Sequence, residues 1–129
     1  MTPELSYLVW SAALTVVLVV IAVGGAALQV GLPELVGNRE DMPKLTGWVG
    51  RAERAHANLL ESLVLFAILV MAAHFAGIRN SMTLLGAQLF FWARVAHAIL
   101  YIAGIPWART AAWTVSIIGL LLIFLQLVA

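Results

Sequence analysis

The charged residues of this chain are concentrated in one short region, and their distribution limits what the chain can fold into. Nine of them lie between Glu34 and Glu61, and the long stretches on either side carry few or none. Residues 5–33 carry no charge at all, and this stretch is longer than the roughly 20 apolar residues that a helix needs to cross a bilayer. The sequence therefore predicts a membrane-spanning helix here.

The overall composition agrees with a membrane protein. Hydrophobic residues make up 64% of the 129 residues and charged residues only 10%, against about 25% charged in an ordinary soluble domain. So little polar surface cannot coat a water-soluble core. The formal net charge of +1 gives no reason to expect a nucleic-acid partner. The absence of cysteine excludes disulfides, thiolate metal sites and a cysteine nucleophile.

Four apolar stretches account for the chain, at about residues 5–30, 48–76, 81–103 and 108–128. Glycine, proline and charged residues separate them and mark the turns. We expect an all-α integral membrane protein with a single domain over residues 1–129, folded as a bundle of four spanning helices. A cleaved signal peptide is an alternative for the first stretch. Glu4 precedes that stretch, however, no basic segment does, and its apolar run is too long.

The basic residues predict how the helices cross the membrane. Loops one and three, with the helix ends beside them, carry five of these residues, whereas loop two has only Arg79. The five are Arg39, Lys44, Arg51, Arg54 and Arg109. Because basic residues accumulate on the cytoplasmic side, we expect loops one and three in the cytoplasm and both termini on the opposite side.

Two of the predicted helices carry a polar stripe. At 100° per residue, four polar residues of the second helix fall within an arc of roughly 80°, and three residues of the third helix within about 60°. The first stripe consists of Arg51, Arg54, Asn58 and Glu61, and the second of Arg94, His97 and Tyr101. Seven stacked polar residues suit a hydrophilic pocket that opens to the cytoplasm, although a purely structural pairing of the two helices is the alternative.

The deepest charges of the two stripes are expected to pair. Counted from the shared end of the helices, Glu61 lies about 20 Å deep and Arg94 about 15 Å deep, at 1.5 Å per residue. A charge near the bilayer centre costs about 2.5–3.5 kcal/mol, so an ion pair between Glu61 and Arg94 is the simplest arrangement. Arg51 is expected to extend to the membrane surface instead. We expect no metal site, because the spacing of His56, His74 and His97 does not fit one.

The segments RAHANLLES and ARVAHAILY resemble the MAPEG family, the membrane-associated proteins in eicosanoid and glutathione metabolism. The resemblance covers roughly the last two thirds of the chain and implies a homotrimer in the lipid bilayer with glutathione bound between subunits. It assigns the binding of glutathione to both stripes, namely to Arg54, Asn58, Glu61, Arg94, His97 and Tyr101. It also implies that Arg109, beside Thr110, stabilises the glutathione thiolate.

This resemblance implies a glutathione-dependent transferase, with or without peroxidase activity, that acts on a hydrophobic small molecule dissolved in the membrane. A bacterial inner membrane is the expected location. Gly31 and Ala57 stand where studied members carry basic residues, so a different thiol or a non-catalytic protein that binds a lipid or thiol is an alternative. A small multidrug exporter is less favoured, because its first span needs a carboxylate and none lies between Glu4 and Glu34.

Overall fold

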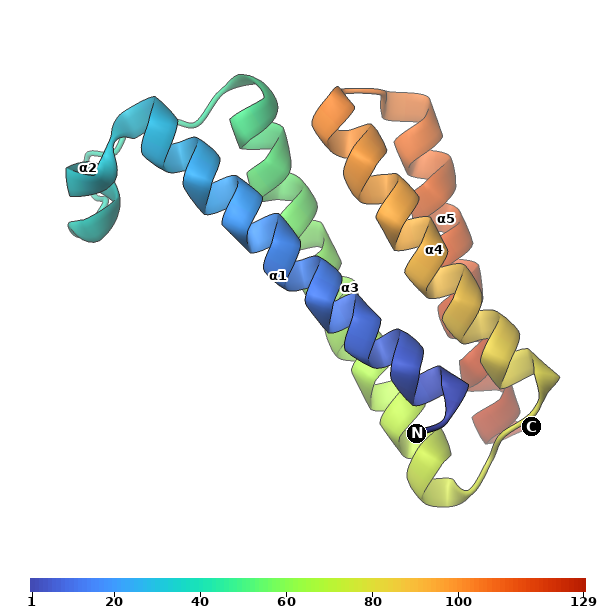
Figure 1. Ribbon diagram of the computed structural model, residues 1–129. Helices are drawn as coiled ribbons and strands as arrows, with labels where there is room; N and C mark the ends of the chain where they lie inside the picture. The colour runs from blue at the N-terminus through green and yellow to red at the C-terminus, as the bar shows by residue number, and fades with distance from the viewer.

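The computed structural model describes all residues, 1–129, and it contains helices and no strands, as the predicted all-α fold requires (Figure 1). Four long helices, α1, α3, α4 and α5, are each long and apolar enough to cross a membrane. Their bounds, with those of the short helix α2, are Pro3–Val30 (α1), Leu32–Val36 (α2), Gly47–Ala76 (α3), Ser81–Ala103 (α4) and Pro106–Val128 (α5). The long helices alternate in direction, so loop one (residues 31–46) and loop three (residues 104–105) share one end. Loop two (residues 77–80) and both termini share the other (Figure 1).

Local capping explains why the helices begin and end where they do. Thr2 accepts a hydrogen bond from the backbone of Leu5, and proline occupies the first position of α1 and of α5, where its missing N–H costs nothing. Both helices therefore begin two residues earlier than the apolar pattern predicts. Gly77 and Gly104 end α3 and α4 in the left-handed conformation, which glycine adopts without strain.

The short helix α2 was not expected within loop one. Pro33 lies in its first turn, and the side chain of Leu35 is buried in a small cluster with Ala26, Leu45 and Val49. The loop returns to the bundle where the Gln29 side chain exchanges two hydrogen bonds with the backbone of Thr46, at 2.8 and 3.1 Å. In Figure 1, α2 lies to one side of the long helices.

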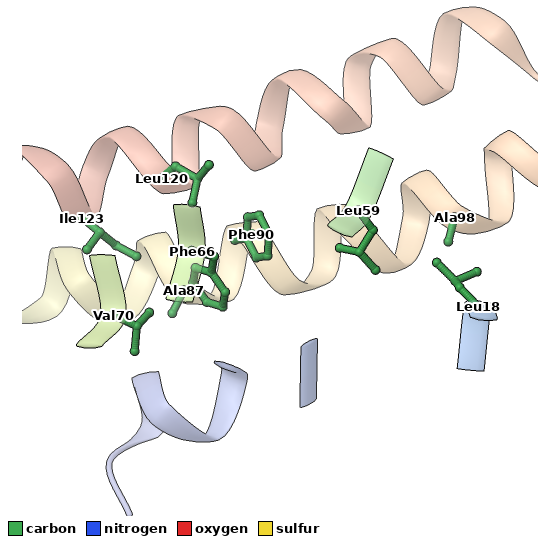
Figure 2. Close-up of a cluster of buried hydrophobic side chains, with 9 residues drawn as sticks. All are labelled: Leu18, Leu59, Phe66, Val70, Ala87, Phe90, Ala98, Leu120 and Ile123. Atoms are coloured by element: carbon green, nitrogen blue, oxygen red, sulfur yellow. The ribbon is translucent and has the colours of Figure 1, made fainter. Parts of the chain in front are cut away.

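The core lies where α1, α3, α4 and α5 converge. Phe66 of α3 and Phe90 of α4 stack with ring centroids 4.1 Å apart, and Figure 2 shows them among the other buried side chains of this cluster. Its remaining members are Leu18, Leu59, Val70, Ala87, Ala98, Leu120 and Ile123. α1 packs against α3 and α4 but does not contact α5, so the bundle consists of an α1–α3 pair beside an α4–α5 hairpin.

The α4–α5 hairpin is held together by an unusually close backbone contact. A Cβ atom added to Gly86 of α4 would lie 2.6 Å from the carbonyl oxygen of Gly119 of α5, and the reverse addition gives the same distance. Only glycine fits at either position, because real Cβ atoms do not approach a backbone so closely. The two helices therefore touch through their main chains near the loop-two end.

The outer surface of the bundle suits lipid. Large apolar side chains on all four long helices are more than half exposed, including Val20, Ile68, Ile99 and Leu121. The charged residue that α1 buries, Glu4, is satisfied by the protein: its carboxylate accepts hydrogen bonds from Arg79 at 3.4 Å and from the Thr83 hydroxyl at 3.1 Å. This ion pair lies at the loop-two end, away from the polar stripes of α3 and α4.

Candidate functional site

The polar stripes of α3 and α4 meet at Asn58 and Arg94. Arg94 is buried in α4 with 1% of its surface exposed, and its Nη2 donates a hydrogen bond of 2.7 Å to Oδ1 of Asn58 in α3. His97 is also buried, one turn further along α4. The charged guanidinium is thus held between two helices and away from lipid, which avoids the cost of exposing it at this depth.

The predicted ion pair between Glu61 and Arg94 does not form. The ion pair that the structure contains is Arg79–Glu4, and Glu61 is exposed on α3. The physical reason is depth: counted along the two helices at 1.5 Å per residue, Asn58 and Arg94 both lie about 15 Å from the loop-three end, whereas Glu61 lies about 20 Å from it. The amide at the matching depth takes the place of the carboxylate.

This pairing leaves most of the Arg94 guanidinium without a partner. Its Nε and Nη1 atoms are buried and make no hydrogen bond within the chain. A buried donor that lacks an acceptor costs about 1–3 kcal/mol, and more when it is charged. The single bond to Arg94 also fixes the amide of Asn58, since the oxygen accepts from the guanidinium and the NH₂ group stays free to donate elsewhere.

A cavity of about 170 Å³ opens beside Asn58 at the loop-three end of the bundle. Three helices line it, through Asn58, His97, Tyr101, Arg109, Thr110 and Trp113. The guanidinium of Arg109 lies over the Tyr101 ring, 4.3 Å from its centroid, and the rings of His97 and Tyr101 meet edge to face at 5.4 Å. No carboxylate lines the cavity, so its electrostatic character is set by cations: Arg109 in the wall and Arg94 directly behind Asn58.

The structure brings five of the eight expected site residues to this cavity and places the other three outside its wall. Asn58, His97, Tyr101, Arg109 and Thr110 line it, whereas Arg94 touches it only through Asn58. Arg54 and Glu61 are exposed on α3. The Thr110 hydroxyl donates to the carbonyl oxygen of Pro106 at 3.1 Å, one turn earlier in α5.

Comparison with known protein families agrees with the resemblance found in the sequence. The sequence profile of the MAPEG family matches residues 5–129, which is nearly the whole chain and extends the likeness into α1. The chain belongs to the MAPEG family. No curated protein matches it in sequence. With four apolar spanning helices and this membership, it is an integral membrane protein.

One residue that lines the cavity was not among the predicted site residues. Trp113 is exposed for 42% of its surface and forms part of the wall on α5. It follows Arg109 by four residues, and residues at this spacing lie on the same face of a helix. The helical period applied to α5 from Arg109 would have identified it.

Arg51 makes a contact that the sequence did not predict. Its side chain reaches from the second turn of α3 to the last turn of α4. There its Nε donates a hydrogen bond of 2.9 Å to the carbonyl oxygen of Ile102. The stripe on α3 therefore divides into residues that hold the helices together, Arg51 and Asn58, and exposed residues, Arg54 and Glu61.

Proposed function

We propose that this protein is a membrane-bound glutathione-dependent transferase that joins the glutathione thiolate to a hydrophobic electrophile dissolved in the bilayer. The observation that carries the proposal is the cavity beside Asn58, which has Arg109 in its wall, Arg94 behind it and no carboxylate facing it. A site with this charge favours an anion. Glutathione carries two carboxylates and becomes a more effective nucleophile when its thiol ionises.

The arginines supply what the reaction needs. A free thiol has a pKa of about 8.5, so a guanidinium close to the sulfur raises the fraction of thiolate at neutral pH. Arg109 is the candidate for this role, because it lies in the cavity wall against Tyr101. The free NH₂ of Asn58 suits an acceptor oxygen of glutathione, and the positive charge of Arg94 behind it favours a carboxylate at that place.

In the proposed reaction the thiol of glutathione loses its proton to solvent, and the thiolate forms a bond to the electrophilic carbon of the second substrate. The leaving group departs with the electron pair of the bond that breaks. Holding both reactants together removes much of the entropic barrier. The apolar electrophile reaches the cavity from the bilayer. Trp113 suits its entry, because this aromatic side chain lines the cavity and is also partly exposed on the outside of the bundle.

A homotrimer is part of the proposal, and two observations support a neighbouring subunit at the site. The cavity of about 170 Å³ is smaller than the roughly 300–1,000 Å³ of most small-molecule sites, so one chain holds only part of glutathione. Glu61 is exposed on α3 at a depth where an uncovered charge costs about 2.5–3.5 kcal/mol. A subunit packed against this face would cover Glu61. The Glu61 carboxylate could then bind the ammonium group of a glutathione held between the two subunits.

The test is to purify the protein in detergent, measure glutathione binding by calorimetry, and follow the conjugation of chlorodinitrobenzene. Binding together with glutathione-dependent turnover is expected. Binding without turnover towards several electrophiles would favour a non-catalytic MAPEG protein, a candidate that the exposed Ala57 and the occupied hydroxyl of Thr110 also favour. Proton-coupled drug uptake into vesicles without glutathione binding would indicate an exporter instead. Native mass spectrometry that finds only monomers would contradict the trimer.

A further inference from the structure

Arg51 makes a contact that the proposed chemistry does not use. It belongs to the first turns of α3, and its Nε donates to the carbonyl oxygen of Ile102, 51 residues away in the last turn of α4. The next turn of the chain is closed around the same side chain: a Cβ added to Gly104 would lie 3.4 Å from the Arg51 Nε. The guanidinium thus occupies the end of α4.

The place of this contact is chemically favourable. The last four carbonyl groups of a helix have no partner within the helix, and the negative end of the helix dipole attracts a cation. Arg51 satisfies one of these carbonyls from a different helix. It therefore acts as a cap for α4 that is supplied by α3.

The end of α4 that Arg51 contacts lies next to the candidate site. Ile102 follows Tyr101, which carries the Arg109 guanidinium on its ring. Loop three contains only Gly104 and Ile105, and the backbone N–H of Arg109 bonds to the carbonyl oxygen of Ile105 at 3.3 Å. A short turn of this kind passes any displacement of the end of α4 on to the start of α5.

Few polar contacts hold the α4–α5 hairpin against α3. Two side-chain hydrogen bonds join α3 to the α4–α5 hairpin, from Arg51 to Ile102 and from Arg94 to Asn58. Both bonds lie toward the loop-three end of the bundle. Along the helix axes, the cavity lies between them. They determine how far Asn58 on α3 stands from Arg109 on α5.

We propose that Arg51 is a positioning residue, which fixes the α4–α5 hairpin against α3 and so sets the position of Arg109 relative to the bound thiol. The inference rests on the proposed function for its catalytic consequence, whereas its geometric part is independent of that function. An arginine that only anchors the chain at the membrane surface is the competing explanation, and a lysine would serve that purpose equally well.

The first experiment compares Arg51→Met, Arg51→Lys and the control Arg39→Met. The control removes the same kind of contact, since the Arg39 Nε donates to the Leu35 carbonyl oxygen at 2.8 Å, but within loop one and outside the cavity wall. For Arg51→Met we expect kcat at neutral pH to fall about tenfold, KM for glutathione to stay within about twofold, and the rate–pH profile to move up by about one unit. Arg51→Lys recovers part of kcat, and Arg39→Met leaves the profile unchanged.

An unchanged rate–pH profile in Arg51→Met, or full activity in Arg51→Lys with a normal profile, would overturn the positioning role. If Arg51→Met does not fold, Arg51→Lys alone decides the matter, because the anchoring role predicts a normal profile for it and the positioning role predicts a shifted one.

The second experiment measures the geometry without any reaction. The chain has no cysteine, so spin labels can be attached to cysteines introduced at Glu53 of α3 and Trp107 of α5, which are both exposed. Diluting labelled chains with unlabelled ones isolates the distance within one subunit. We expect Arg51→Lys and Arg51→Met to broaden the distance distribution, and Arg39→Met to leave it narrow. A narrow distribution in all variants would disprove the inference, whereas broadening in a protein that does not bind glutathione would leave the geometric part standing and reject the proposed function.

Discussion

The guanidinium of Arg109 lies 4.3 Å from the centre of the Tyr101 ring, which joins the first turn of α5 to the last turn of α4. A contact of this type stabilises by about 0.5–1 kcal/mol when exposed and about 2 kcal/mol when water is excluded. The ring restricts the orientation of the arginine while leaving its N–H groups free at the edge. Arg109 is thereby held in the cavity wall without being neutralised by a carboxylate.

Replacing Arg109 by alanine is expected to remove the stabilisation of the thiolate. Turnover at neutral pH should fall by about tenfold or more, because each unit by which the thiol pKa rises removes about nine tenths of the thiolate near pH 7. Activity should recover in part as the pH rises toward the ordinary thiol pKa, and glutathione affinity should stay within a few-fold. The measurement is rate against pH at saturating glutathione. An unaltered profile would remove Arg109 from the mechanism.

Replacing Asn58 by leucine is expected to destabilise the fold as well as the site, because it leaves the buried guanidinium of Arg94 with no partner at all. We expect the free energy of unfolding to fall by about 1–3 kcal/mol. Adding Arg94→Met should restore part of the loss, which a double-mutant cycle in mild detergent measures. Losses that simply add would show that the two side chains do not interact. Asn38→Leu in the exposed part of loop one serves as the control.

Adding a methyl group at the contact between α4 and α5 should separate the two helices. Gly86→Ala places a Cβ atom 2.6 Å from the carbonyl oxygen of Gly119, so we expect a loss of stability of about 1–3 kcal/mol. Gly24→Ala is the matched control, because no atom lies within 4 Å of the added Cβ and alanine favours a helix. The melting temperature should fall for the first variant and stay equal or rise for the second. Equal melting temperatures would contradict the close contact.

The orientation in the membrane is predicted from the basic residues and can be measured by labelling. Cysteines introduced at Asn38 in loop one and Ser81 beside loop two lie at opposite ends of the bundle, and both positions are exposed and neutral. An impermeant maleimide added to intact cells should label the cysteine at position 81 and spare the one at position 38. The reverse pattern would place loops one and three outside the cytoplasm.

The sequence is informative about the helices because the bilayer leaves few alternatives. Runs of apolar residues long enough to cross it must form helices, so the bounds of α1, α3, α4 and α5 agree with the predicted spans to within two residues. The helical period also places Asn58 and Arg94 on facing stripes. Helix α2 was not predicted, because Pro33 and Gly37 indicate a loop as readily as a short helix. The formation of this helix depends on the burial of Leu35, which the local sequence does not reveal.

The contacts within the site were harder to predict than its location. Charge alone favours Glu61 as the partner of Arg94, and only the relative depth of the two helices selects Asn58 instead. The contact between Arg51 and Ile102 has no sequence signature, because the acceptor is a backbone carbonyl that every residue possesses. Side-chain patterns therefore predict which faces meet, whereas the pairing of individual atoms depends on how the helices slide along each other.

The close contact between Gly86 and Gly119 is a point about which α5 can rotate relative to α4. Gly119 lies ten residues beyond Arg109 in α5, so Arg109 stands about 15 Å from this contact along the helix. A rotation of about 10° around the contact would carry the start of α5 by about 2.6 Å for an arm of this length. A displacement of this size exceeds the tolerance of a hydrogen bond, so the position of Arg109 at one end of α5 depends on how tightly Gly86 and Gly119 hold the two helices together near the other end.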